Sequence, residues 1–194
     1  MLKRLPLIPT LVVLIAVAVM VRLGCWQLDR LYQKEALLAL YAKAGQAPER
    51  ALEGWDGPRV PDGLLYHRVW FDCARLGAIA PRAGHNAKGD TGWAQVADCT
   101  TQQGDRIEVV LGWASSPAPV RWQGGLVHGT LNGGGALVAD PPLAGLAANA
   151  KPDPSAMPNN HLSYALQWFA FALTALVIYA LALRKRLAAG GEGG

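Results

Sequence analysis

Two long apolar runs, one near each end of the chain, constrain its fold more than any other feature. Leu5–Val21 supplies about 17 residues and Leu162–Leu183 about 22, and a helix needs roughly 20 to span a bilayer. The first run is short, but Arg22 at its outer end can extend its side chain to the headgroups. We therefore predict one transmembrane helix over residues 1–23 and a second over residues 161–183.

The placement of the basic residues predicts the orientation of these helices. Lys3 and Arg4 precede the first run and Arg184–Arg186 follow the second, as expected for cytoplasmic ends. Both termini are then cytoplasmic, with a basic tail over residues 184–194, and residues 24–160 face the periplasm. A short N-terminus without an Arg- and Ser-rich transit segment favours a bacterial inner membrane. The net charge is +4, but the other basic residues are scattered, so we expect contact with membrane lipids and no nucleic-acid partner.

Two other interpretations of the first run are open. A cleaved signal peptide has the same basic start and apolar core, but the nearest small-residue cleavage pattern, Ala42–Ala44, lies about 20 residues beyond that core. A lipoprotein signal would use Gly24 and Cys25, but Arg22 stands where that motif has an aliphatic residue. We therefore favour an uncleaved helix.

The segment between the runs predicts a helical extension followed by β strands. Residues 25–44 lack proline and glycine and carry an apolar stripe, which favours continuation of the first helix. The fold class is then membrane α+β, with two transmembrane helices flanking a mostly antiparallel β extracytoplasmic domain, a small barrel or curled sheet. A parallel α/β domain is disfavoured because no second amphipathic helix lies between the strands. The predicted strands are 66–76, 92–100, 105–114, 124–132 and, more weakly, 136–140, and residues 140–158 are predicted to form a surface loop.

The three cysteines carry no redox or metal motif. No CxxC, CxxxC or CxxCH occurs, which argues against a thioredoxin-like site, a compact copper site and covalent haem. Cys73 and Cys99 are compatible with a disulfide in an oxidising compartment, or with two buried free thiols, which we favour. Cys25 is then left at the membrane surface.

No enzyme motif is present either. The sequence lacks G-x-S-x-G, H-E-x-x-H, a P-loop and G-x-G-x-x-G, and its acids form no evident pair. We therefore expect no catalytic activity. An anchored periplasmic enzyme of unknown chemistry is kept as an alternative interpretation of the chain. The isolated residues His67, His85 and His128 are assigned structural or surface roles. The acids that form no evident catalytic pair with one another in the sequence are Asp29, Asp56, Asp90, Asp105 and Glu108.

His161 differs from the other histidines because it opens the second apolar run at the depth of the membrane surface. Tyr164 and Trp168 follow at +3 and +7, on the same helical face. A neutral imidazole beside an aromatic groove can ligate a haem iron from one side. Arg30 and Lys34, one turn apart on the first helix, suit the haem propionates, and Gln27 lies on a nearby face. The simpler interpretation is a polar residue at a helix start, with the basic pair against lipid headgroups.

Two motifs at these positions resemble signatures of the Surfeit locus protein one family. Residues 24–34, GCWQLDRLYQK, are similar to its G-x-W-Q-x-x-R-x-x-x-K motif, and residues 159–169, NNHLSYALQWF, to its N-N-H-L-x-Y-A-x-Q/T-W-F motif. Trp26 is part of the first motif. The resemblance extends to the whole arrangement of two transmembrane helices with a domain between them in the sequence. The central domain departs from the pattern: Leu111-Gly112-Trp113 stands where the family usually has R-G-W, the glycine after the first strand is lost in residues 71–74, and the domain is short.

The resemblance implies an assembly factor for haem-copper cytochrome c oxidase. Its expected role is to help insert haem a into subunit I or to hand it over, with haem A synthase as a further candidate partner. The expected cofactor-binding residues are His161, Tyr164, Trp168, Trp26, Gln27, Arg30 and Lys34, with His161 as the ligand of the haem iron. The alternative is a stable structural accessory subunit of the oxidase that binds no haem.

Overall fold

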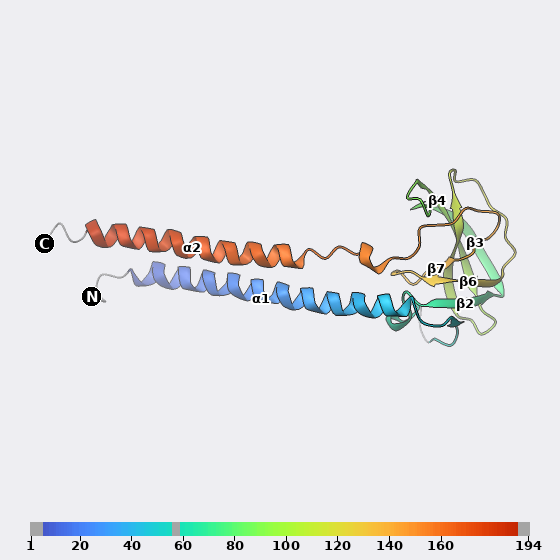
Figure 1. Cartoon of the computed structure of the whole chain (residues 1–194), viewed down its shortest axis with the longest axis horizontal. Coiled ribbons are helices and arrows are strands. Elements are labelled where there is room, and N and C mark those ends of the chain that lie inside the picture. The colour runs from blue at the N-terminus through green and yellow to red at the C-terminus, as the bar shows by residue number, and fades with distance from the viewer. Residues whose placement is uncertain (1–5, 56–58, 190–194) are drawn as a thin grey trace. The chain divides into compact units, whose positions relative to one another are not determined.

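The computed structural model describes residues 6–55 and 59–189 (Figure 1). Lys3, Arg4 and Asp56, which the sequence analysis named, lie outside the described residues. The chain divides into two compact units. The first comprises residues 1–36 and 158–194 and contains the paired helices, except for the end of the first helix. The second comprises residues 37–157 and contains the sheet, so each is described by itself.

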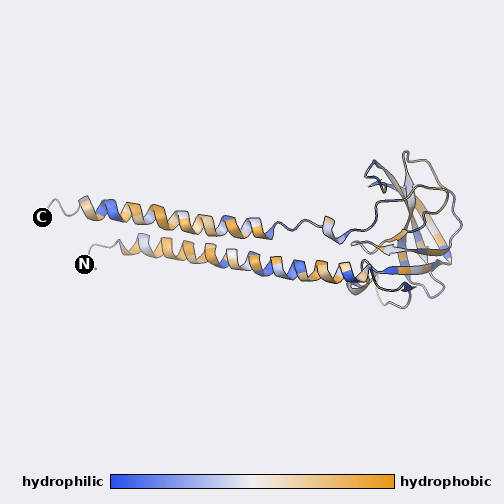
Figure 2. Ribbon diagram, in the orientation of Figure 1, coloured by the Kyte–Doolittle hydropathy of each residue, from blue (hydrophilic) through white to orange (hydrophobic). Residues whose placement is uncertain are grey.

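Two long helices, α1 (Leu7–Ala44) and α2 (His161–Ala189), are each long and apolar enough to cross a membrane. Only 6% of the most apolar stretch of each is buried in the protein, which leaves apolar side chains to face lipid. Figure 2 shows hydrophobic residues along α2 and along the N-terminal half of α1. The predicted continuation of the first helix over residues 25–44 is confirmed, because α1 runs unbroken to Ala44, just before Gly45.

Within the first unit, α1 and α2 pack against each other along a seam of partly buried side chains. Alternating steps of three and four residues keep such a seam on one side of each helix, as in knobs-into-holes packing. Ala165 is 1% exposed and Ala172 4%, so small residues of α2 lie against α1 and let the two helices approach closely. On α1 the seam comprises Thr10, Val13, Val17, Met20, Gly24 and Gln27, and on α2 His161, Ala165, Trp168, Ala172, Ala175 and Tyr179.

The second unit is built on one seven-stranded sheet in the order β1-β2-β6-β7-β5-β4-β3. Four of its six strand pairings are antiparallel, and β1·β2 and β5·β7 are parallel. The mostly antiparallel domain predicted from the sequence is therefore confirmed. The strands are β1 (Arg50–Ala51), β2 (Arg68–Cys73), β3 (Arg75–His85), β4 (Thr91–Thr100), β5 (Arg106–Ala114), β6 (Gly125–Leu131) and β7 (Leu137–Ala139).

The prediction of one strand over residues 66–76 is wrong. Ala74 separates β2 from β3, and β3 runs on for 11 residues. The composition of β3 does not indicate a separate strand, because it contains Gly77, Pro81 and Gly84 and only one β-branched residue. At the edge of the sheet a proline costs little, since the missing N–H has no ladder partner to lose.

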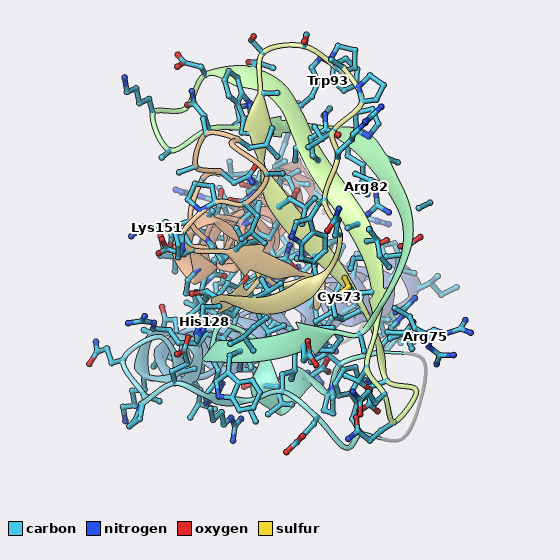
Figure 3. The ribbon with its side chains drawn as sticks, turned by 90° about the vertical axis from the view of Figure 1, so that its right-hand side faces the viewer. Cys73, Arg75, Arg82, Trp93, His128 and Lys151 are labelled. Atoms are coloured by element: carbon cyan, nitrogen blue, oxygen red, sulfur yellow. A yellow bond between two sulfur atoms is a disulfide. The ribbon has the colours of Figure 1, made fainter. Side chains whose placement is uncertain are left out.

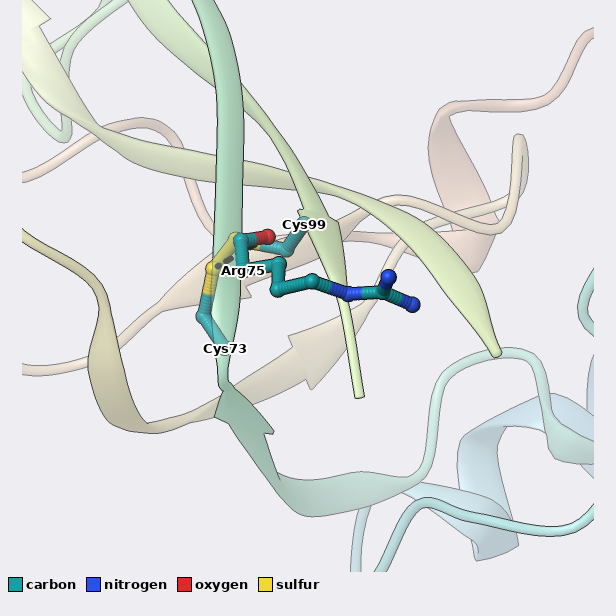
Figure 4. The surroundings of a disulfide bond; sticks show 3 residues. All are labelled: Cys73, Arg75 and Cys99. Atoms are coloured by element: carbon teal, nitrogen blue, oxygen red, sulfur yellow. Dashed lines mark hydrogen bonds between the residues drawn. A yellow bond between two sulfur atoms is a disulfide. The ribbon is translucent and has the colours of Figure 1, made fainter. Parts of the chain in front are cut away.

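The sheet curls on itself around an apolar core. Because Ala74 alone joins β2 to β3, which lie near opposite ends of the strand order, the two ends must approach each other. Alternate residues of β2 point inward, and Val69 and Phe71 are fully buried. A disulfide between Cys73 and Cys99 ties β2 to β4 across this closure (Figure 4). The favoured expectation of two free thiols is therefore wrong; the two strands place the Cα atoms 5.2 Å apart, within disulfide range.

The segment after β7 packs against the sheet, so its prediction as a surface loop is only partly correct. Trp113 and Ala147 exchange two backbone hydrogen bonds of 2.7 and 3.0 Å. A Cβ on Gly112 would lie 2.4 Å from the Cβ of Leu146, so only glycine lets the segment approach the strand this closely. Leu111, which stands where the family has arginine, is fully buried in the core.

Candidate functional site

The two sequence motifs meet within the helix pair. The imidazole Nδ1 of His161, the first residue of α2, lies 2.7 Å from the side-chain oxygen Oε1 of Gln27 on α1. An amide oxygen can only accept, so Nδ1 carries the proton in this bond and donates it. The second ring nitrogen, Nε2, then keeps its lone pair. A hydrogen bond that fixes the tautomer in this way is the usual outer-shell arrangement of a histidine that ligates a metal.

Gly24 sets how closely the helices approach beside this contact. It lies almost one turn before Gln27 on α1 and is buried. A Cβ there would lie 2.5 Å from Cε1 and 2.7 Å from Cζ of Phe169 on α2. The absent side chain therefore leaves room for the Phe169 ring. In the sequence Gly24 stands in a possible lipoprotein signal and at the start of the first motif, and neither pattern predicts its contact with Phe169.

The aromatic residues of α2 follow His161 along one side of the seam. Tyr164 is 50% exposed, and Trp168 is half-buried and meets Phe171 edge to face, with ring centroids 6.3 Å apart. Phe169 contacts Gly24 on one flank of the α2 face that meets α1. Helical periodicity places His161, Tyr164 and Trp168 toward the opposite flank of that face. The predicted aromatic neighbours therefore form a partly exposed apolar wall beside the imidazole.

The predicted site residues on α1 do not all face α2. Some lie on the α1 surface beside the seam. Trp26 is 42% exposed, and the Arg30 guanidinium lies 5.7 Å from its ring centroid, a cation–π distance. Arg30 also donates a 2.9 Å hydrogen bond to Gln33. Lys34 lies about two turns beyond Gln27 on α1 and is half-buried, and no carboxylate pairs with it among the described residues. Gln27 is the predicted residue that contacts His161 directly.

The donor set fits haem better than a bare metal ion. Among the residues that the structure describes, no three His, Cys, Asp or Glu side chains gather to hold a metal. A haem iron needs only one or two ligands from the protein, because the porphyrin supplies the other four. One imidazole with a fixed tautomer, next to Tyr164 and Trp168, meets that requirement.

Fold and site together define a membrane protein with two spanning helices, a curled β domain between them in the sequence, and a partly buried Gln–His contact in the helix pair. A sequence model described as the SURF1 family matches residues 14–173, which include most of α1, the whole sheet and α2 as far as Leu173. The chain therefore belongs to the SURF1 family, which functions in cytochrome c oxidase assembly. No curated protein and no solved structure matches the chain.

Proposed function

We propose that this protein is a non-enzymatic assembly factor that carries haem a to subunit I of cytochrome c oxidase, receiving it from haem A synthase. The observation that supports the proposal most is the 2.7 Å bond between His161 Nδ1 and Gln27 Oε1. It leaves Nε2 as the ligating nitrogen, and it joins the two motifs that carry the family resemblance.

A carrier has to bind its cargo and also release it. One imidazole beside a partly exposed aromatic wall gives a weak site, so haem a would pass to subunit I by relative affinity. Trp168 and Tyr164 offer apolar surface to the ring, and Arg30 and Lys34 offer positive charge to the propionates. In this proposal Gln27 is a positioning residue that acts through His161.

The proposed location is a bacterial inner membrane, with both termini in the cytoplasm and the β domain in the periplasm. The Arg184–Arg186 cluster after the second apolar run supports this orientation. The Cys73–Cys99 disulfide supports it independently, because structural disulfides persist in oxidising compartments such as the periplasm.

The test is the visible spectrum of the detergent-purified chain, co-produced with a haem A synthase. We expect a haem a spectrum for the native chain and a weakened or shifted spectrum for His161→Ala. Added imidazole should restore the native spectrum in His161→Ala, because it can occupy the position of the lost ring. A native chain that carries no haem a under these conditions would contradict the proposal.

Two variants serve as matched controls. Tyr179→Phe removes the hydroxyl that contacts Thr10 elsewhere on the same seam, so it tests a general weakening of the helix pair. His67→Ala removes a histidine of the β domain, so it tests adventitious haem binding. Both should keep the native spectrum. If Tyr179→Phe loses haem a as fully as His161→Ala does, the effect belongs to helix packing and not to ligation.

The second candidate function is a stable accessory subunit of the oxidase that binds no haem. The same Gln27–His161 bond favours it, because a partly buried interhelical hydrogen bond also holds two membrane helices together. Purified oxidase distinguishes the two functions. A subunit should remain with the mature enzyme in equal amount, and His161→Gln should leave the haem a content of subunit I unchanged. A carrier should leave the mature enzyme, and His161→Gln should lower that content.

A further inference from the structure

The β-domain unit contains a hollow that the helix-pair site does not use. Its volume is about 340 Å³, at the lower end of the range of ligand pockets. Several separate segments of residues 37–157 form it: the end of α1, the start of β2, parts of β6 and β7, and the segment after β7 (residues 140–157), called the return segment below. The residues that carry the argument are Tyr41, Tyr66, Arg68, Asp140, Asn149 and Lys151.

The floor of this pocket is the outer face of the sheet. Arg68 on β2 pairs in register with Thr130 on β6, and Thr130 pairs with Val138 on β7. Residues directly opposite on neighbouring strands share a face, so these three form one row. On β2 the inward positions are those of the buried Val69 and Phe71, which places Arg68 outside the core. The row therefore offers a floor of Thr130 and Val138 with one guanidinium at its end.

Tyr66 forms a wall of the pocket at a cost in backbone strain. Its φ of 63° lies in the left-handed region, which a residue with a large side chain rarely adopts. Its ring packs on Tyr41 with centroids 4.7 Å apart, and a Cβ on Gly133 would lie 2.5 Å from its hydroxyl. Burial, reinforced by Tyr41 and Asp153, raises the pKa of Tyr66, so the phenol stays neutral and does not repel an anion. Strained residues held by several contacts in this way concentrate at binding sites.

The charges that line the pocket favour an anion. Two cations, Arg68 and Lys151, and one carboxylate, Asp140, line it; a second carboxylate, Asp153, acts on Tyr66 from outside the lining and accepts hydrogen bonds from Ser155. The Lys151–Asp140 pair is 3.8 Å long with side chains 85% and 65% exposed, so it is weak and leaves the lysine available. Arg68 has no carboxylate partner among the described residues. Figure 3 labels Lys151 on the return segment.

The lining of this pocket also includes a buried hydrogen-bond donor, the side-chain amide of Asn149. Asn149 is 8% exposed, and its amide nitrogen has no hydrogen-bond partner within the described part of the chain. A buried donor without an acceptor costs about 1–3 kcal/mol, so such groups usually mark a missing ligand, ion or water. A turn of this amide toward the pocket would give it an oxygen of a bound anion as acceptor.

We propose that this pocket binds a small carboxylate with a flat apolar body, its carboxylate oxygens between Arg68 and Lys151 and its body against Tyr41 and Tyr66. The pocket lies entirely within the β-domain unit, and the proposal does not depend on haem binding by the helix pair. It gives the β domain a ligand of its own.

The test uses the full chain in lipid nanodiscs and a one-ring probe, 3-phenylpropionate, with binding followed by calorimetry. Arg68→Gln should weaken binding by about tenfold, because it removes a charge-assisted hydrogen bond worth at least about 1.5 kcal/mol. Lys151→Gln should weaken it by a smaller factor. The neutral analogue 3-phenylpropionamide should bind about tenfold more weakly than the acid.

Two further variants keep the result interpretable. Arg121→Gln removes an exposed arginine outside the pocket and should bind as the native chain does. Arg68→Lys keeps the charge and should retain most of the affinity, which separates loss of charge from loss of fold. The proposal is overturned if the native chain does not bind millimolar probe, if the amide binds as well as the acid, or if Arg68→Gln and Arg121→Gln bind alike.

Discussion

Gly24→Ala should push the helix pair apart at the point where the Gln27–His161 contact depends on its spacing. The new Cβ would lie 2.5, 2.7 and 2.9 Å from three atoms of the Phe169 ring, whereas ordinary contacts begin at 3.4 Å. The ring or the helix must therefore withdraw by about 1 Å. Overpacking of this kind typically costs about 1–3 kcal/mol.

The displacement should also reach the histidine. Gln27 lies almost one turn from Gly24, and its bond to His161 is 2.7 Å long. A helix shift of about 1 Å would stretch it beyond the length of a hydrogen bond. We therefore expect Gly24→Ala to weaken haem a binding even though residue 24 does not touch the imidazole.

The assay is equilibrium unfolding of the chain in mixed micelles, followed by helical circular dichroism as the denaturing detergent is increased. Gly24→Ala alone should lower the free energy of unfolding by about 1–3 kcal/mol, and Phe169→Leu in the same chain should recover most of it. Phe169→Leu alone is the control for the lost ring. A Gly24→Ala chain as stable as the native one, or a double variant no better than the single, would refute the packing described for this seam.

Three further predictions concern the β domain. Replacing both Cys73 and Cys99 by Ala opens a loop with a sequence separation of 26, so urea unfolding should show a loss of about 3.5 kcal/mol; a loss below about 1 kcal/mol would contradict the chain-entropy argument. Hydrogen bonding to Arg82 lowers the pKa of Glu108 from its ordinary 4.5, so the pair stabilises the fold above that pH and loses its effect as pH falls through the lowered pKa. Both side chains are over 40% exposed, so Arg82→Gln should cost at most about 1 kcal/mol at pH 7 and nothing at pH 2; an equal cost at both would refute the ionic origin. Gly112→Ala should cost about 1–3 kcal/mol, because the return segment contacts that Cα directly, and an unchanged urea midpoint would argue against this packing.

The helices and their motifs were predictable because each depends on local sequence. Length and apolar composition predict a span, and the absence of proline and glycine from residues 25–44 predicts that the helix continues. The small size of Ala165 and Ala172 is compatible with their burial between the helices. Which α1 residues face them did not, since pairing two helices requires knowledge of their relative register.

The sheet was less predictable because its edge strand depends on context. β3 is rich in alanine, glycine and arginine and has little intrinsic β preference, so its pairing with β4 supplies the strand conformation. The Cys73–Cys99 pairing likewise depends on the curling of β2 toward β4, which no local pattern records. The pocket beside Tyr66 was unpredictable for the same reason, because its residues come from separate segments.

The central claim is that Gln27 holds His161 as the Nδ1–H tautomer, so that Nε2 is free to ligate haem a. Nitrogen-15 NMR of histidine-labelled chain in micelles tests it directly, with His161 assigned by loss of its signals in His161→Gln. We predict a protonated Nδ1 and an unprotonated Nε2, loss of this preference in Gln27→Ala, and a large shift or loss of the Nε2 signal when haem a is added. A protonated Nε2 in the native chain, or a His161 spectrum that haem a leaves unchanged, would contradict the account.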